Sequence, residues 1–187
     1  MKGEQRLHIP HIPVTLCEPL LQGFYTNFWR VDRRAHGGNS RSQSSLFYDE
    51  VEEPASQCLS FALVRDPVDR FIDAARIYGM CKSQYDLVRF IEDNDTPPET
   101  EDRSFYPQHL FVGPHTEIFK YETDYDVLIR ALASCGIFHP EYDPHYNKKS
   151  APVFEVDRSE ISSYLGKVRR WYLQDYKQFG YLGKKTS

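Results

Sequence analysis

The sequence predicts a single α/β domain, spanning residues 1–187, in which a central parallel β-sheet is flanked by helices. The chain length lies within the range of one domain, and a content of 40% hydrophobic and 27% charged residues is typical of folded globular proteins. Short apolar runs alternate with segments whose apolar residues recur every three or four positions. Strands and helices that alternate in this way favour a parallel sheet covered by helices.

The first part of the chain is expected to contribute two strands and one helix. Residues 7–10 form a short apolar run, and after a proline-containing turn a helix is expected over residues 17–29. Residues 32–57 are polar and rich in Ser, Arg and Gly, which predicts a long irregular connection. Residues 59–64 (LSFALV) form a continuous apolar run, which predicts a strand that is buried on both faces and therefore central.

A helix with a well-defined start is predicted directly after this central strand, in the segment RDPVDRFIDAARIYG. Asp66 is placed to cap the helix, Pro67 suits its first position, and Asp69 can complete a capping box. The residues expected to face the core are Val68, Phe71, Ile72 and Ala75.

Another helix is expected over residues 84–93, with Leu87, Phe90 and Ile91 on its apolar side. The sequence after it is acidic and contains prolines, which predicts an exposed loop over residues 93–104.

The last part of the chain predicts one more strand and two helices. The strand is expected over residues 116–122, and the helix after it is capped by Asp124 and closed by Gly136. An apolar stripe then predicts a final helix over residues 159–179, which Gly180 ends.

The predicted sheet indicates where functional residues should be sought. In parallel sheets flanked by helices, ligands bind beyond the carboxyl ends of the strands. The two strand-to-helix turns, residues 10–16 and residues 65–68, are therefore the expected functional segments.

Charge and motifs argue against several function classes. The formal charge of −4 is unlike that of a protein whose main task is to bind the phosphates of nucleic acids. Because no apolar run approaches 18 residues and the N-terminus lacks a signal segment, we expect no membrane association and a cytosolic location.

The cysteines and histidines show no metal-ligand spacing, so no metal is expected. GxxxxGK[ST], GxGxxG and GxSxG are all missing, which removes the usual sequence support for an NTPase, a dinucleotide oxidoreductase or an α/β-hydrolase.

The segment LVRDPVDRFIDAA resembles the strand–loop–helix signature of the membrane-type and carbohydrate sulfotransferases. Four later segments follow in the family's order: SFYPQHLF, EIFKYETDYDVLIRAL, HYNKKS and RRWYLQDYKQFGY, so that the resemblance covers about residues 58–181. It implies a P-loop-like sulfotransferase fold and transfer of a sulfo group from 3′-phosphoadenosine-5′-phosphosulfate (PAPS) to a hydroxyl group. The early start of the fold suggests a bacterial or viral member without a membrane stalk, located in the cytoplasm or, if viral, in the host cytoplasm or virion.

Residues 8–16 (HIPHIPVTL) resemble the family's donor loop, which directs backbone N–H groups and a helix N-terminus at the 5′-phosphosulfate. His11 stands where the family has Lys, while Pro13 and Val14 stand in place of glycines. The proline removes an N–H group, and the branched valine hinders close approach of the donor. Thr15 either binds a phosphate or caps the following helix.

A second departure concerns the 3′-phosphate of the donor. The family binds this phosphate with the Arg of its RDP motif, here Arg65, and with a Ser eight residues later, where this chain has Asp73. A carboxylate accepts but does not donate hydrogen bonds and repels a phosphate. Arg65 is therefore either an anion ligand or the partner of Asp69 or Asp73 in an ion pair.

The remaining site candidates follow from the same resemblance. It implies a His or Glu base between the donor loop and the central strand, and His36 is the only histidine there; the alternative is an exposed loop histidine. Lys148 and Ser150 either approach the nucleotide or are solvated. Gln108 and Glu122 are expected to fix the loop and the strand around the site.

Two functions are consistent with these residues. An active enzyme would use PAPS and act on a hydroxyl-bearing small molecule or a saccharide. A catalytically degenerate protein would keep the fold as a binding or assembly component with protein partners. The altered donor loop and Asp73 favour the second function, whereas Arg65 favours the first.

Overall fold

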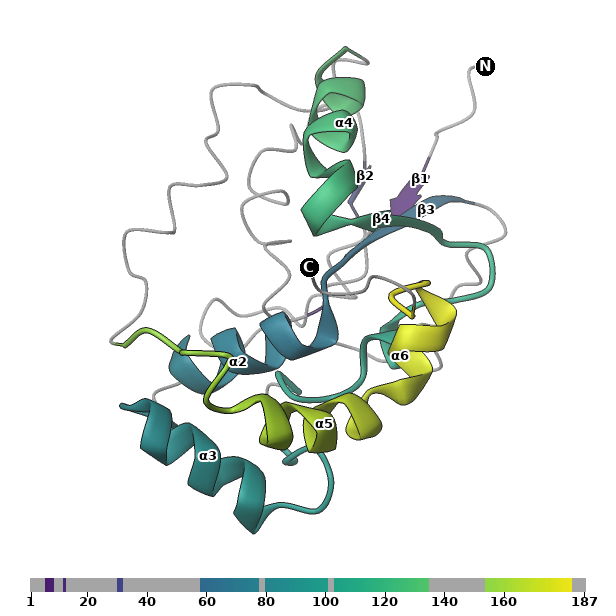
Figure 1. Ribbon diagram of the computed structural model, residues 1–187. Helices are drawn as coiled ribbons and strands as arrows, with labels where there is room; N and C mark the ends of the chain where they lie inside the picture. Colours follow the sequence, from purple (N-terminus) through teal and green to yellow (C-terminus); the bar gives the residue numbers. More distant parts are fainter. Residues whose placement is uncertain are drawn as a thin grey trace, which may run out of the picture.

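A parallel sheet of four strands organises the described part of the chain (Figure 1). The computed structural model describes residues 6–8, 12, 30–31, 58–77, 80–100, 103–134 and 154–182. Its strands are β1 (Arg6–His8), β2 (Arg30–Val31), β3 (Cys58–Val64) and β4 (Glu117–Lys120). Its helices are α2 (Pro67–Ile77), α3 (Gln84–Asp93), the 3₁₀ helix η4 (Gln108–Phe111), α4 (Tyr121–Ser134), α5 (Ser162–Trp171) and α6 (Leu173–Gln178). The prediction of an α/β chain with parallel strands is confirmed.

The sheet has the order β2-β1-β3-β4, so that β3 pairs on both sides as expected for the central strand. In the paired register Leu7 lies opposite Leu59, and Ala62 lies opposite Ile118. Residues 61–64 are at most 3% exposed, which agrees with a strand buried on both faces. The first strand was predicted over residues 7–10; in the structure it begins one residue earlier, at Arg6, and residues 9–10 lie outside the described residues. The two-residue strand β2 was not predicted, because so short an element leaves no periodic pattern.

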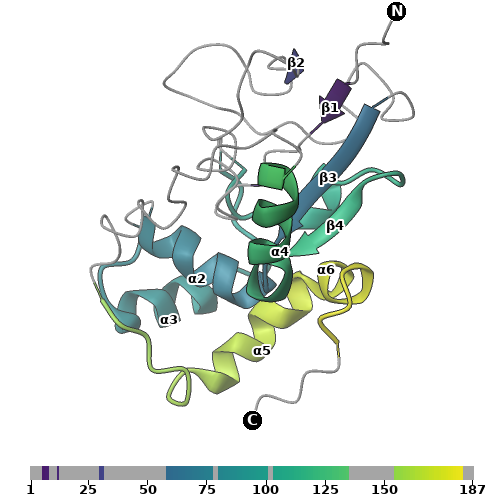
Figure 2. The same ribbon diagram turned by 90° about the horizontal axis from the view of Figure 1, so that it is seen from above.

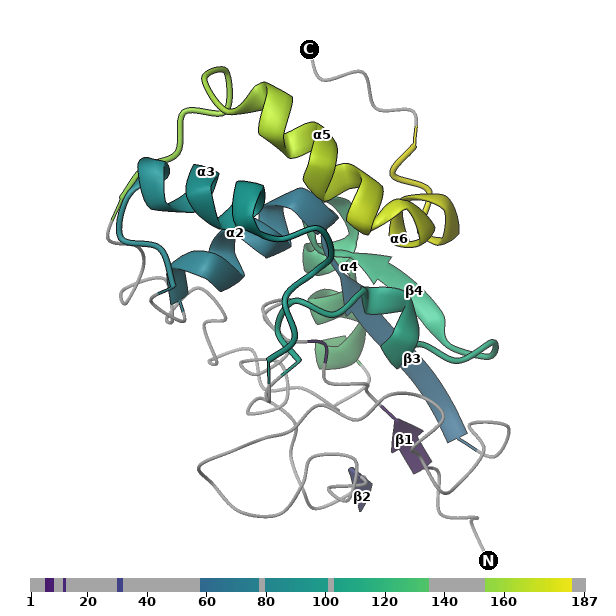
Figure 3. The same ribbon diagram turned by 90° about the horizontal axis from the view of Figure 1, so that it is seen from below.

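Helices α2, α3 and α5 pack together beyond the carboxyl end of β3, whereas α4 packs on β3 and β4 (Figures 2 and 3). The four core-facing residues predicted for α2 are all at most 3% exposed. Phe71 lies at the centre of an aromatic cluster, where its ring centroid is 6.0 Å from that of Phe90, 5.6 Å from that of Phe105 and 5.7 Å from that of Trp171. The predicted bounds of α3 are confirmed, and Ser83 caps it by accepting a hydrogen bond from the Asp86 N–H.

The start of α4 differs from the prediction. The helix begins at Tyr121, directly after β4, and not after a cap at Asp124. The carboxylate of Asp124 accepts a hydrogen bond from the backbone N–H of Lys120 at 2.9 Å, so it stabilises the helix start from inside the first turn. Because strand and helix adjoin without a loop, the predicted strand over residues 116–122 is shorter in the structure. The predicted closing residue Gly136, the helix over residues 17–29 and the connection over residues 32–57 lie outside the described residues.

The predicted final helix is two helices, α5 and α6, separated at Tyr172. The backbone there has φ −106° and ψ 23°, but the Tyr172 N–H still bonds to the Val168 carbonyl at 3.3 Å. The apolar stripe therefore continues through the break, and periodicity alone cannot reveal it. Gly180 ends α6 as predicted, with a φ of 65° that favours glycine, and the next N–H, of Tyr181, bonds back to the Tyr176 carbonyl at 3.0 Å.

Candidate functional site

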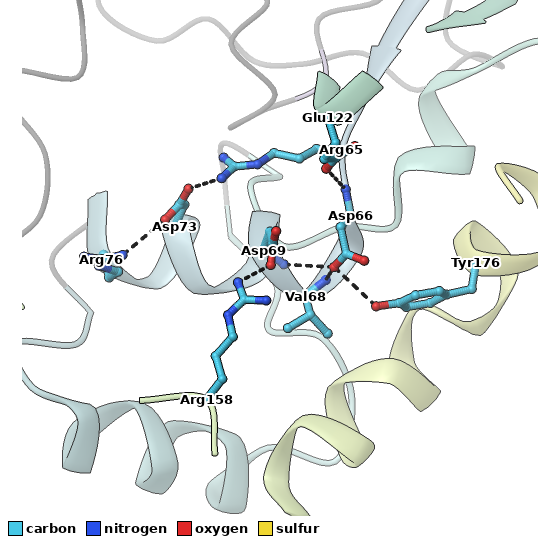
Figure 4. A network of polar contacts seen from close by, with 9 residues as sticks. All are labelled: Arg65, Asp66, Val68, Asp69, Asp73, Arg76, Glu122, Arg158 and Tyr176. Carbon is cyan, nitrogen blue, oxygen red and sulfur yellow. Dashed lines mark hydrogen bonds and ion pairs between the residues drawn. The ribbon is translucent and has the colours of Figure 1, made fainter. Parts of the chain in front are cut away.

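The candidate site lies at the turn between β3 and α2, at the carboxyl end of the central strand (Figure 4). The carboxylate of Asp66 accepts hydrogen bonds from the N–H groups of Val68 at 2.9 Å and Asp69 at 3.2 Å, and Pro67 is the first residue of α2. The predicted cap and helix start are therefore confirmed. The predicted capping box is wrong, because the N–H of Asp66 donates to the carboxylate of Glu122 at 2.6 Å and not to Asp69.

The backbone of Arg65 is held by Gln108, a fully buried side chain. Its Oε1 accepts from the Arg65 N–H at 3.0 Å, and its Nε2 donates to the Arg65 carbonyl at 2.8 Å. Asp175, also fully buried, fixes this segment in turn, because it accepts hydrogen bonds from the N–H groups of Gln108 at 2.8 Å and His109 at 2.9 Å. The His109 Nδ1 lies 2.6 Å from the same carboxylate. The predicted role of Gln108 in fixing the turn is confirmed.

Glu122, at the start of α4, fixes the neighbouring residue of the turn. One of its carboxylate oxygens accepts from the Asp66 N–H, and the other accepts from the hydroxyl of Tyr181 at 2.9 Å. The hydroxyl of Tyr176 lies 3.4 Å from the carboxylate of Asp66. The predicted structural role of Glu122 is thus confirmed, and residues from α4 and the C-terminal helices meet at one strand end.

Burial raises the pKa of the Asp66 carboxyl above its ordinary value of 3.8, and the charge of Asp69 raises it further. Well below pH 3.8 the carboxyl is protonated in both the folded and the unfolded chain. As the pH rises, the unfolded chain releases this proton first, so the contribution of Asp66 to stability falls until the pH exceeds the raised pKa.

Asp66→Asn is expected to remove this loss of stability, since Asn still caps the helix but does not ionise. The free energy of unfolding of the wild type, relative to that of the variant, should decline as the pH rises from about 3 toward 7. Urea unfolding of both proteins across this range measures the difference. If the free energies of unfolding of the two proteins ran parallel across this pH range, the raised pKa of Asp66 would be contradicted.

The side chain of Arg65 turns along α2 and forms an ion pair with Asp73, with Nη2 2.6 Å from Oδ2 (Figure 4). Its guanidinium also lies over the ring of Tyr121, 5.4 Å from the ring centroid. Asp69 pairs with Arg158 instead. The sequence left Asp69 and Asp73 as possible ion-pair partners of Arg65, and in the structure the partner is Asp73.

Arg65 and Asp73 line a pocket of about 280 Å³ along one face of α2. The described residues that line it are Arg65, Asp69, Ile72, Asp73, Arg76, Glu155, Val156 and Arg158. Positions 69, 72, 73 and 76 share a helix face because of their spacing. The described part of its lining thus combines three arginines with three carboxylates.

Two of the predicted site residues, Arg65 and Asp73, are brought together. The other five, His11, Thr15, His36, Lys148 and Ser150, lie outside the described residues. Sequence reasoning missed Arg76 and Arg158. The spacing of Arg76, three positions after Asp73 on a predicted helix, is a signal that could have placed it beside this carboxylate. Arg158 lies 89 positions from its partner Asp69, and no local pattern could have paired them.

Comparisons with protein-family models, with curated proteins and with solved structures find no match for this chain. No helix in the described ranges combines the length and apolar character needed to cross a bilayer. Within those same ranges, no three His, Cys, Asp or Glu side chains gather so as to hold a metal ion.

Proposed function

We propose that this chain is a sulfotransferase-like protein with a P-loop-like sulfotransferase fold, which binds a nucleotide phosphosulfate at Arg65. The observation that carries the proposal is the convergence of the segments that resemble the family. Gln108 of SFYPQHLF binds the backbone of Arg65, and Glu122 of EIFKYETDYDVLIRAL binds that of Asp66. Tyr176, from the closing segment, approaches the Asp66 carboxylate. Segments far apart in the sequence thus support one turn, at the edge where parallel sheets bind ligands.

The proposed reaction transfers a sulfo group to a hydroxyl-bearing small molecule or a saccharide. The bond from sulfur to the bridging oxygen of the donor breaks, a bond from sulfur to the acceptor oxygen forms, and a base takes the acceptor's proton. The resemblance implies PAPS as the donor and a His or Glu base, for which His36 is the candidate. Arg65 supplies positive charge at the end of β3, where it would bind a phosphate group of the nucleotide.

A specific observation favours a second candidate function, that of a degenerate sulfotransferase-like protein that binds or assembles with protein partners. Asp73 already neutralises Arg65, with 2.6 Å between the charged groups. A donor phosphate would have to displace this carboxylate or bind beside it, which costs affinity.

Calorimetric titration with adenosine 5′-phosphate and with adenosine 3′,5′-bisphosphate distinguishes the two candidates. The proposed function predicts that at least one nucleotide binds in the micromolar range, about −8 kcal/mol. Arg65→Met should weaken this binding by about tenfold or more, because a hydrogen bond to a charged group is lost. The control Arg170→Met, on the exposed face of α5, should leave it unchanged.

No binding of either nucleotide at millimolar concentration would reject the first candidate in favour of the second. Nucleotide binding that persists unchanged in a folded Arg65→Met protein would remove Arg65 from the site.

A further inference from the structure

The described lining of the pocket beside Arg65 is electrically balanced, unlike a basic phosphate cradle. Its described lining contains Arg65, Arg76 and Arg158 against Asp69, Asp73 and Glu155, whose formal charges cancel. Both aspartates are already paired with an arginine. A doubly charged phosphate that entered this pocket would meet carboxylates as well as guanidinium groups, and the two contributions oppose each other.

Asp73 is held in a fixed position on the pocket wall. Its Oδ2 faces Arg65 at 2.6 Å, and its Oδ1 faces the Nη1 of Arg76 at 3.4 Å. Arg76 is itself anchored, because it donates to the carbonyl of Phe154 and lies over the ring of that residue. The side chain of Asp73 nevertheless remains 28% exposed. Its carboxylate is therefore pre-positioned and open to a ligand.

The chemistry of this carboxylate distinguishes a hydroxyl from a phosphate. An ionised carboxylate has about four lone-pair positions, so that after two contacts with arginines it can still accept hydrogen bonds from a ligand. A ribose hydroxyl donates such a bond, whereas an ionised phosphate offers only acceptors and like charge. Dinucleotide-binding proteins make the same distinction. An acidic residue binds the ribose hydroxyl, and where the ribose carries a phosphate instead, an arginine accommodates that phosphate.

We propose that Asp73, paired with Arg65, makes this pocket select a nucleotide whose ribose carries a free 3′-hydroxyl over the same nucleotide phosphorylated at that position. This inference rests on the proposed function, and it changes the donor that the resemblance implies, because PAPS carries a phosphate where the selected nucleotide carries a free 3′-hydroxyl. Asp73 supplies to Arg65 the negative charge that a 3′-phosphate would otherwise bring, and it accepts the hydrogen bond of the 3′-hydroxyl.

The test compares the two nucleotides by calorimetry in three proteins. The wild type is expected to bind adenosine 5′-phosphate about tenfold or more tightly than adenosine 3′,5′-bisphosphate, since one hydrogen bond to a charged group is gained and one like-charge contact is avoided. Asp73→Ser frees Arg65 and provides a hydroxyl donor, and it should reverse the order of the two affinities. Asp69→Ser is the matched control, because it removes a carboxylate of the same pocket that does not pair with Arg65, and it should preserve the wild-type order.

The outcomes separate this inference from the proposed function. Tighter binding of the bisphosphate by the wild type, or an unreversed order in folded Asp73→Ser, overturns the selectivity but leaves nucleotide binding intact. Failure of both nucleotides to bind the wild type rejects the proposed function and the inference with it. Circular dichroism verifies the fold of each variant, and Asp73→Asn, which also removes the charge, replaces Asp73→Ser if the latter does not fold.

Discussion

Arg70→Met is expected to lower the free energy of unfolding by about 3 kcal/mol. Arg70 is fully buried in α2, donates from Nη1 to the Ser104 carbonyl at 2.7 Å and from Nη2 to the Tyr106 carbonyl at 2.6 Å, and lies over the ring of Tyr172. Methionine fills much of the same space but leaves both carbonyls without these donors, at a cost of about 1–3 kcal/mol each. Removal of the buried charge returns part of that cost.

Urea unfolding monitored by circular dichroism measures this effect. The control Arg170→Met makes the same change on the exposed face of α5 and should alter the free energy of unfolding by less than about 0.5 kcal/mol. The affinity for nucleotide should fall as well, since Arg70 fixes the chain immediately before Gln108, which holds the backbone of Arg65. Equal stabilities for Arg70→Met and its control would show that these buried hydrogen bonds contribute nothing.

Asp175→Asn is expected to lower the free energy of unfolding by about 2–3 kcal/mol. In the fully buried Asp175, Oδ2 accepts from the N–H of Gln108, and Oδ1 accepts from the N–H of His109 and contacts the ring of the same histidine. An asparagine has one oxygen, so its NH₂ group must face one of these N–H donors, and two donors then oppose each other in the interior.

Amide hydrogen exchange gives a second measurement for Asp175→Asn that a general loss of stability would not imitate. Exchange at the amides of Gln108 and His109 should accelerate more than at the amides of β3. The control Asp93→Asn, at the exposed end of α3, should leave stability and exchange close to the wild type. Uniform acceleration across the chain would contradict a local role for Asp175.

The parts of the fold that the sequence predicted well are those with a strong local pattern. The apolar run of β3, the Asp66–Pro67 start of α2 and the periodicity of α3 each determine an element within a few residues. Two of the elements that were missed or misplaced depend on distant contacts. η4 is supported by Asp175 from the other end of the chain, and the break at Tyr172 accompanies a hydrogen bond from its hydroxyl to the Phe105 carbonyl at 2.7 Å.

The residues of the candidate site also fall into those with a local sequence signal and those placed by distant contacts. Sequence reasoning identified Arg65 and Asp73 and left open which carboxylate pairs with Arg65. The structure settled that question, because Asp73 forms an ion pair with Arg65 along α2, whereas Asp69 forms one with Arg158. The roles of Arg158 and Asp175 could not be predicted, since each contacts the site from a segment more than 60 residues away.

By itself, the sequence determined the class of the fold, the central strand and the turn that carries Arg65, because hydrophobic periodicity and helix capping act between residues close in the chain. Only the tertiary structure decided which charges are paired and which remain open to a ligand. An arginine in a sequence has many possible partners, and the one it takes depends on which distant segments packing brings within a few ångströms of it. For Arg65 that partner is Asp73, and this pairing decides whether the pocket presents a free positive charge or a carboxylate fixed beside it.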